Sequence, residues 1–373
     1  MTAEDKLKTD IPKANVKTGK HFVFLRNLLT GIVVAMVLLG TIECLLRILN
    51  VDPSPRFPLI NSHDVKRHML FADDTGNLAD TVIDNIVNNH FTTPDSHLIF
   101  RVRQNEEQTP MFKKIGINAL GFRGRLISER KGGIRILILG DSCAYGWGIT
   151  DIAETFPGRL EKLLAARGIP TEIYNLSQPG YSTTQGLILY REWQPIIKPD
   201  VLILYFGWND IWNSPKLTDR QTISLLRVVN QPFITAILSS RITSVLRAVL
   251  HPFTNNIIIK QRDALTTRND ALPVRVPINE AIENYREMSS RGLVLIVLPP
   301  FDHSHTDLMR MAEYKEAVGK NLSASATIIE IPEMEGPKAV DYFRRDGYHP
   351  NQTGAAVIAS SLADSLEKCR KNR

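Results

Sequence analysis

The 373-residue sequence predicts an α/β domain, a parallel sheet with helices on both faces. Three observations support this prediction. Short apolar runs recur along the chain, amphipathic helical patterns separate them, and glycine or polar residues follow the first three runs. With 43% hydrophobic and 23% charged residues, the chain is large enough for one large domain or two small ones.

Five apolar runs are the predicted strands, at residues 134–139, 171–176, 200–206, 293–298 and 327–331. They are almost continuously apolar instead of alternating, which is typical of strands buried on both faces. Residues 155–168 and 278–292 carry apolar residues at i, i+3 and i+4 and end on glycine, as amphipathic helices do. Residues 211–275 exceed a simple crossover, and their segment 234–250 predicts an inserted helical element.

The N-terminal region predicts a membrane anchor. Residues 22–49 are mostly apolar, with no charge from 28 to 42, and are long enough to span a bilayer. Glu43 and Arg47, at helical i,i+4 spacing, are expected to form an interfacial pair. Because lysines precede the helix, residues 1–21 are expected in the cytoplasm and everything after about residue 50 outside, in the periplasm or extracellular space. A cleaved signal peptide is the alternative, but no A-x-A-like site follows the apolar core.

The net charge of +6 lies in the two tails. Residues 1–27 and 367–373 each carry an excess of +3, and the remaining 35 basic and 35 acidic residues cancel. The basic composition therefore gives no indication of a nucleic-acid partner. Residues 50–92 are expected to form a membrane-proximal segment, and residues 93–370 the catalytic domain. The three cysteines suggest no disulfide pair.

Polar residues follow several of the predicted strands. GDS at 140–142 follows the first strand, Gly180 the second and GWND at 207–210 the third. DGYH at 346–349 comes after the fifth strand and a helix-like stretch. Because ligands of open α/β sheets bind at the carboxyl ends of the strands, we expect these residues to meet at one edge. Together they supply a nucleophile, a base with a carboxylate, and oxyanion donors, as acyl transfer requires.

These four blocks, in this order, resemble those of the SGNH (GDSL-type) hydrolase family. The resemblance covers roughly residues 95–367 and includes INALGFRG at 117–124, which looks like the lead-in of envelope-associated members. It implies ester hydrolysis and a three-layer α/β/α sandwich with a flavodoxin-like five-stranded sheet. Cys143 replaces the leucine of the GDSL name, and Ser177 stands where many relatives carry glycine. Neither departure touches the catalytic set.

The resemblance implies a role for each residue of the blocks. Ser142 is the expected nucleophile, His349 the general base, and Asp346 the carboxylate that orients the imidazole. The backbone N–H groups of Ser142 and Gly180 and the side-chain amide of Asn209 are the expected oxyanion donors. This chemistry requires no cofactor.

Other residues near these blocks have alternative interpretations. Cys143 is a second candidate nucleophile, because thiols at helix starts are activated, but the family pattern favours the seryl oxygen. Asp141 and Asp210 are expected to be structural.

Three side chains are candidates for substrate binding. Trp147 and Trp208 either line an acyl pocket or pack in the core. His303 lies in the loop FDHSHTD at 301–307, where it could contact substrate. The histidines and aspartates of that loop could bind a metal, but a polar loop without a metal is the favoured interpretation.

The sequence therefore predicts a membrane-anchored serine esterase that removes acetyl or another small acyl group from an envelope glycan or lipid. An O-acyltransferase acting on an extracytoplasmic polysaccharide is an alternative, because water and a sugar hydroxyl attack the same acyl-enzyme. A non-catalytic envelope adaptor is a third hypothesis. The substrate, acyl length and oligomeric state do not follow from fold and motifs.

Overall fold

The structure is a computed structural model of the chain. It describes residues 16–51, 92–95, 97–102, 113–130, 132–212, 217–229, 231, 237, 240–246, 249, 274–301, 308–335 and 339–371. The contacts divide the chain into two compact units. One comprises Met1–Pro58 and Pro232–Arg262, and the other Leu59–Gln231 and Asp263–Arg373. The predicted site residues all belong to the second unit.

A five-stranded sheet with the order β4-β3-β5-β6-β7 forms the centre of the second unit. Its strands are all parallel: β3 (Ile134–Gly140), β4 (Thr171–Asn175), β5 (Val201–Tyr205), β6 (Leu293–Val297) and β7 (Thr327–Ile329). Each predicted apolar run is a strand, and the flavodoxin-like order is confirmed. Strand β3 pairs with both β4 and β5, so the GDS block follows an interior strand.

Strand β3 shows why the apolar runs do not alternate. Its residues Ile136, Leu137, Ile138 and Leu139 are all fully buried. Successive side chains of a strand point to opposite faces, and both faces of this sheet carry helices. Each of these four positions is therefore apolar.

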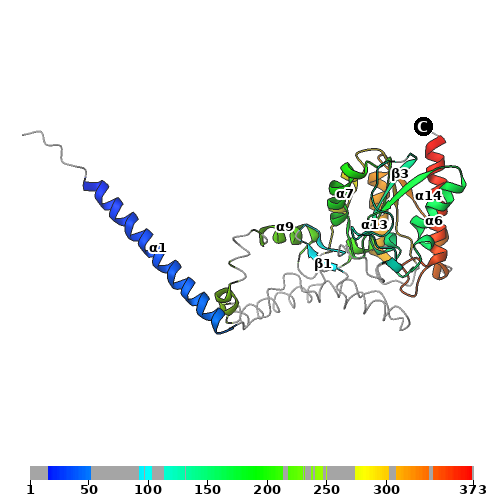
Figure 1. Cartoon of the computed structure of the whole chain (residues 1–373). Helices are drawn as coiled ribbons and strands as arrows, with labels where there is room; N and C mark the ends of the chain where they lie inside the picture. Colours follow the sequence, from blue (N-terminus) through cyan, green and yellow to red (C-terminus); the bar gives the residue numbers. More distant parts are fainter. Residues whose placement is uncertain are drawn as a thin grey trace, which may run out of the picture. The chain divides into compact units, whose positions relative to one another are not determined.

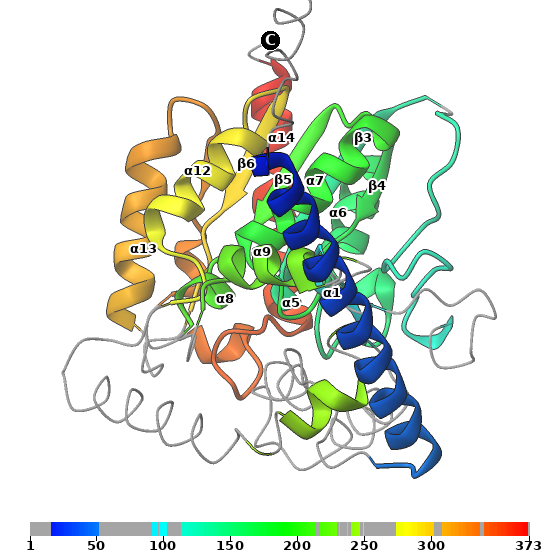
Figure 2. The ribbon, with the colours of Figure 1, turned by 90° about the vertical axis from the view of Figure 1, so that its left-hand side faces the viewer.

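Helices cover the sheet in two layers (Figure 1, Figure 2). Helices α6 (Phe156–Ala166) and α14 (Gln352–Lys371) pack together on one face. Helices α7 (Thr183–Ile197), α12 (Ile278–Met288) and α13 (Leu308–Leu322) cover the other. The helices predicted at 155–168 and 278–292 correspond to α6 and α12, and the α/β/α sandwich is confirmed.

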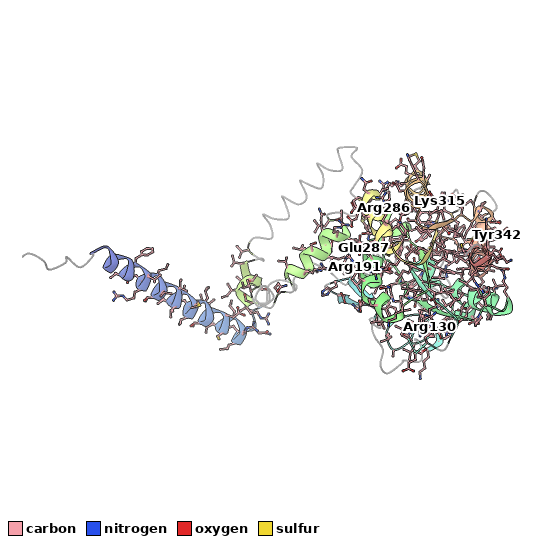
Figure 3. The ribbon with its side chains drawn as sticks, turned by 90° about the horizontal axis from the view of Figure 1, so that it is seen from above. Arg130, Arg191, Arg286, Glu287, Lys315 and Tyr342 are labelled. Carbon is pink, nitrogen blue, oxygen red and sulfur yellow. The ribbon has the colours of Figure 1, made fainter. Side chains whose placement is uncertain are left out.

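Local signals fix where two of these helices begin and how they meet. The Thr155 side chain caps α6, and Ser182 and Gln185 form a reciprocal capping box at the start of α7. Arg191 on α7 donates two hydrogen bonds to Glu287 on α12, both of 2.6 Å, and Figure 3 shows the two side chains between these helices. Both side chains are largely exposed, so this pair contributes little to stability.

A short hairpin precedes the sheet and was not predicted. Strands β1 (Thr92–Asp95) and β2 (Ile99–Val102) pair antiparallel. Each has four residues and β1 contains Pro94, so the sequence shows no clear alternation. The hairpin supports the segment after β4, because Tyr181 Oη donates to the Phe100 carbonyl at 2.7 Å.

The first unit contains helix α1 (Val16–Ile48), whose bounds match the predicted apolar segment 22–49 except for an earlier start. Within it, Val23–Ile48 has the length and composition of a membrane-spanning helix, and none of that stretch is buried. A signal sequence near an N-terminus has the same properties.

Glu43 on α1 has two kinds of partner. Arg47 Nε donates to Glu43 Oε1 at 2.8 Å, which confirms the predicted pair. The same carboxylate accepts hydrogen bonds from the backbone N–H groups of Arg241, at 2.9 Å, and Ile242, at 3.1 Å. Residues 241–246 are helical, so the carboxylate caps a helix of the predicted insertion. Helix α9 (Asp219–Val229) of the insertion belongs to the second unit.

Several predictions concern residues outside the described part of the chain. They are the basic tail up to residue 15, most of the membrane-proximal segment 50–92, and the loop 302–307 with His303. The predicted domain boundaries stay predictions.

Candidate active site

Strand β3 ends at a backbone position that only glycine fits. A Cβ on Gly140 would lie 2.5 Å from the Tyr205 carbonyl oxygen and 2.4 Å from the Ala144 Cβ. Asp141 then caps the one-turn helix α5 (Ser142–Tyr145), because its side chain accepts a hydrogen bond of 2.8 Å from the Cys143 N–H. Ser142 is thus the first residue of a helix at the carboxyl edge of the sheet.

Three side chains from the first and last blocks lie in hydrogen-bonded series. Ser142 Oγ is 2.7 Å from His349 Nε2. The other ring nitrogen, Nδ1, is 2.8 Å from Asp346 Oδ2. These contacts join residues 207 positions apart in sequence, and they have the geometry of a nucleophile, a base and an orienting carboxylate.

Asp346 is held as a charged acceptor. Burial acts to raise its pKa, but hydrogen bonds from the His349 ring and from the backbone N–H groups of His349 and Tyr348 outweigh burial and lower the pKa. The backbone bonds to Oδ1 measure 2.9 Å from His349 and 3.2 Å from Tyr348. A carboxylate at Nδ1 favours the tautomer that carries a proton there, which leaves Nε2 as an acceptor toward Ser142.

The turn that carries Asp346 and His349 is closed on itself. The Arg344 N–H donates to the His349 carbonyl at 2.8 Å, and Phe343 and Pro350 form an antiparallel bridge. The turn needs a positive φ of 79° at Gly347, which glycine adopts readily.

The predicted oxyanion donors follow β4 and β5. Gly180 has a φ of +81°, and a Cβ there would lie 3.2 Å from the Phe100 ring. Asn209 is buried in the single-turn helix α8 (Trp208–Ile211), which Gly207 precedes. Within the described residues, no hydrogen bond uses the N–H of Ser142, the N–H of Gly180 or the Nδ2 group of Asn209. These three donors are available to a ligand atom.

Two other carboxyl groups are fully buried near the strand ends. Burial raises the pKa of Asp141 to about 6 and that of Asp210 to about 7. Asp210 accepts hydrogen bonds of 2.8 Å from the Thr183 N–H and 2.7 Å from Tyr314 Oη. It thereby connects α8 to α7 and α13, while Asp141 caps α5. Both contacts are structural.

The alternative nucleophile is in the wrong environment. Cys143 is buried, and its Sγ contacts the Tyr348 carbonyl at 3.4 Å. Burial, with the nearby Asp141 and Asp346 carboxylates, raises the pKa of the thiol well above its usual value. A thiolate is disfavoured there, and His349 contacts Ser142 instead.

The candidate substrate-binding tryptophans are both buried. Trp208 is 1% exposed. It packs edge-on against Phe301, with a ring-centre distance of 5.9 Å, and at a tilt against Tyr348, with a ring-centre distance of 5.2 Å. Trp147 is 8% exposed and packs beside Tyr145. Their role in an acyl pocket stays a prediction, as does that of His303. Among the residues that the structure describes, no group of three or more His, Cys, Asp or Glu could hold a metal.

Arg123 supports the nucleophile segment, and the sequence analysis gave it no role. It is 3% exposed. Within the described part of the chain, its guanidinium donates to backbone carbonyls alone, those of Ile115, Tyr145, Gly146, Ile149 and Thr150. Burial lowers its pKa. Four of these carbonyls lie within or just after α5, so the GFRG motif of the lead-in fixes the chain that follows Ser142. The motif was the available signal, although its partners were not predictable.

Comparisons with known proteins give one family match and several similar solved structures. The GDSL-like lipase/acylhydrolase family matches residues 138–357. Among solved structures, TesA is 14% identical with a TM-score of 0.42, over 63% of this chain and 98% of its own. A lipase/acylhydrolase from Enterococcus faecalis is 16% identical with a TM-score of 0.42, over 63% of this chain and 96% of its own. An acetyl-xylooligosaccharide esterase from Geobacillus is 15% identical with a TM-score of 0.40, over 63% of this chain and 94% of its own.

The comparison with curated proteins finds no match. The family match alone extends from β3 into α14, over more than half of the chain. It includes the GDS, GWND and DGYH blocks. This chain belongs to the GDSL-like lipase/acylhydrolase family, the SGNH hydrolases, and is an ester-hydrolysing enzyme.

Proposed function

We propose that this protein is a membrane-anchored serine esterase that removes acetyl or another small acyl group from a glycan or lipid of the cell envelope. The observation that carries the proposal is the contact of 2.7 Å between Ser142 Oγ and His349 Nε2, with Asp346 at the far side of the ring.

The first half of the reaction forms an acyl-serine. Ser142 Oγ attacks the ester carbonyl carbon while His349 Nε2 takes the hydroxyl proton. The carbonyl π pair moves onto oxygen, and the tetrahedral intermediate then expels the alcohol, which takes the proton from His349. Asp346 stabilises the imidazolium while it exists. In the second half, water attacks the acyl-serine with His349 again as base, and collapse releases the acid and restores the hydroxyl.

The oxyanion is expected to be bound by the N–H groups of Ser142 and Gly180 and by Asn209 Nδ2. These donors are fixed before the substrate arrives, so they cost no reorganisation when charge develops on the carbonyl oxygen. Each such donor contributes roughly 3 kcal/mol to transition-state stabilisation in related enzymes.

Helix α1 supports the proposed location and, through it, the proposed substrate class. An apolar helix of this length, preceded by a lysine-rich segment, favours a single span with the N-terminus in the cytoplasm. An esterase on the outer side of such a span meets acylated glycans and lipids of the envelope.

The test uses the full chain purified in detergent and p-nitrophenyl acetate as substrate. We expect Ser142→Ala to abolish hydrolysis and labelling by a fluorophosphonate, with the label of the unmodified protein mapping to the peptide that contains Ser142. Ser290→Ala is the matched control, because Ser290 is exposed. Equal hydrolysis by the Ser142→Ala variant would overturn the proposal.

Two further measurements address substrate and location. Incubation with an acyl donor and soluble glycans, followed by mass spectrometry, separates hydrolysis from transfer, since acylated glycan in place of free acid would indicate an O-acyltransferase. Protease treatment of intact cells tests the orientation. We expect the protease to cleave the catalytic domain from outside the cytoplasmic membrane. If the domain stays uncleaved after the outer layers of the cell have been permeabilised, the predicted orientation is wrong.

A further inference from the structure

Arg275 lies where the chain returns to the catalytic domain after the insertion. Its N–H donates to the Trp212 carbonyl at 2.8 Å, and its carbonyl accepts from the Asp219 N–H at 2.9 Å. The next residue, Val276, donates to the Asp210 carbonyl at 3.1 Å. The backbone at Arg275 and Val276 is therefore hydrogen-bonded to Asp210 and Trp212, within and just after the GWND block, and to Asp219, at the start of α9.

The guanidinium of Arg275 is held by a buried carboxylate. Its Nε donates to Asp219 Oδ1 at 3.1 Å and its Nη2 to Oδ2 at 2.8 Å, a two-point contact. The two side chains are 3% and 7% exposed. Ser182 Oγ also donates to Asp219 Oδ2, at 2.6 Å. Two parallel hydrogen bonds to a carboxylate fix the plane of a guanidinium as a single ammonium contact cannot.

The remaining donors of this guanidinium reach both motif residues of the predicted oxyanion hole. Nη1 donates to the Gly180 carbonyl at 2.9 Å and to Asn209 Oδ1 at 3.4 Å. Nη2 also donates to Gln185 Oε1 at 3.0 Å. One side chain thus contacts Gly180, in the segment after β4, and Asn209, in the helix after β5.

We propose that Arg275 is a positioning residue for the oxyanion hole. It acts through Asn209, and the inference rests on the proposed function, in which Asn209 Nδ2 donates to the oxyanion. A terminal amide has two orientations that differ by a half-turn and exchange its oxygen and nitrogen. The Arg275 guanidinium can only donate hydrogen bonds, so it favours the orientation in which the acceptor Oδ1 faces it. Nδ2 then lies on the opposite side of the amide.

The reversed amide would present an oxygen to the developing negative charge. It would then repel the charge instead of stabilising it, and the amide would have to turn during the reaction. Oxyanion donors are effective because they need no such reorganisation. Asp219 contributes indirectly, since it fixes the guanidinium that fixes the amide.

The experiment measures kcat and KM of the full chain in detergent with p-nitrophenyl acetate. Arg275→Lys keeps a positive charge beside Asp219 but removes the planar fork. We expect kcat to fall by about 10- to 100-fold while KM stays nearly unchanged. This decrease in kcat should not exceed the decrease caused by Asn209→Ala. Adding Arg275→Lys to Asn209→Ala is expected to cause no further loss, because both act on one donor.

Two controls separate positioning from stability. Arg191→Lys makes the same substitution in another two-point pair, with Glu287 on the surface, and is expected to leave kcat and KM unchanged (Figure 3). Arg275→Met combined with Asp219→Leu removes both buried charges together, so it leaves neither one unpaired in the core. This paired variant is measured alongside Arg275→Lys, and thermal unfolding is recorded for each.

The possible failures are distinguishable. Hydrolysis that survives Ser142→Ala overturns the proposed function itself. If Ser142→Ala abolishes hydrolysis, the Arg275 inference is overturned by any one of three results: Arg275→Lys and the paired variant keep full kcat, Asn209→Ala has no effect, or the losses at 275 and 209 multiply. The esterase activity and the roles of Ser142, His349 and Asp346 then stand without it.

Discussion

The two halves of the active site are built differently. The proton-transfer half consists of three side chains in direct contact, and two of them, Asp346 and His349, lie three residues apart in one closed turn. The proposed oxyanion half consists of two backbone N–H groups and one side-chain amide. Its support comes from Arg275, which is 95 positions beyond Gly180 and 66 beyond Asn209.

This difference separates chemistry that a motif contains from geometry that the fold supplies. A short loop can hold a carboxylate against an imidazole, because the turn itself brings them together. Donors from separate strands have no such local constraint. Here the guanidinium of a buried ion pair contacts two of the residues that carry these donors, and it is proposed to orient the amide of Asn209. Substitutions in the proton-transfer half are expected to abolish or nearly abolish kcat, whereas those in the oxyanion half are expected to lower kcat by smaller factors.

The largest effect is expected for Asp346→Asn in the proton-transfer half. The pKa of Asp346 is lowered, so the carboxylate remains charged well below neutral pH. The asparagine keeps the shape but removes the charge and disfavours the required tautomer, so kcat should fall by about 10⁴-fold. The measurement is kcat against pH with p-nitrophenyl acetate. A loss below tenfold at neutral pH would contradict the role assigned to Asp346.

A smaller effect, on stability, is expected for Arg123→Met. The variant leaves buried carbonyls around α5 without their donor, so the free energy of unfolding should fall by about 3 kcal/mol. Urea denaturation of the full chain in detergent measures this change. Arg125→Met is the matched control, because Arg125 lies near the surface, where it pairs with Glu161. Equal losses in the two variants would mean that the carbonyl contacts of Arg123 do not matter.

The smallest effect is a pH dependence at Asp210, beside the oxyanion half. Burial raises the pKa of Asp210 from 3.8 to about 7, while hydrogen bonds from Thr183 and Tyr314 and the charge of Arg275 act in the opposite direction. Between about pH 4 and pH 7 the folded protein therefore binds more protons here than the unfolded chain. This contribution to stability is present below pH 4 and is lost as the pH rises toward 7.

Asp210→Asn fixes the neutral form, with Oδ1 able to accept from the Thr183 N–H and Nδ2 able to donate to Tyr314 Oη. We expect the difference in unfolding free energy between the variant and the unmodified protein to shift in favour of the variant as the pH rises from 4 to 7. Urea denaturation at a series of pH values measures that difference. Other groups, such as Asp141, titrate in both proteins, so their contributions cancel in the difference. Parallel curves would show that Asp210 does not titrate in this window.

Several features were predictable because their signals are local. The five strands are continuous apolar runs, and α6 and α12 follow their helical periodicity. The proximity of Asp346 and His349 follows from a spacing of three residues. Because the carboxyl ends of parallel strands lie at one edge of a sheet, Ser142 was predicted to lie near His349. The structure places the two side chains in contact.

Other features depended on tertiary contacts. The β1–β2 hairpin has too few residues to show a pattern, and its position follows from its contacts with the segment after β4. Arg123 and Arg275 look like ordinary basic residues in the sequence. Only the fold shows that each is buried and which distant carbonyl or carboxylate it meets.

The sequence by itself determined the α/β class, the strands and the residue types of an acyl-transfer site, because periodicity and motif spacing act over a few residues. The tertiary structure alone decided which groups hold that site in shape. A buried guanidinium requires acceptors from whichever segments surround it, and those segments are brought together only when the sheet and its helices pack.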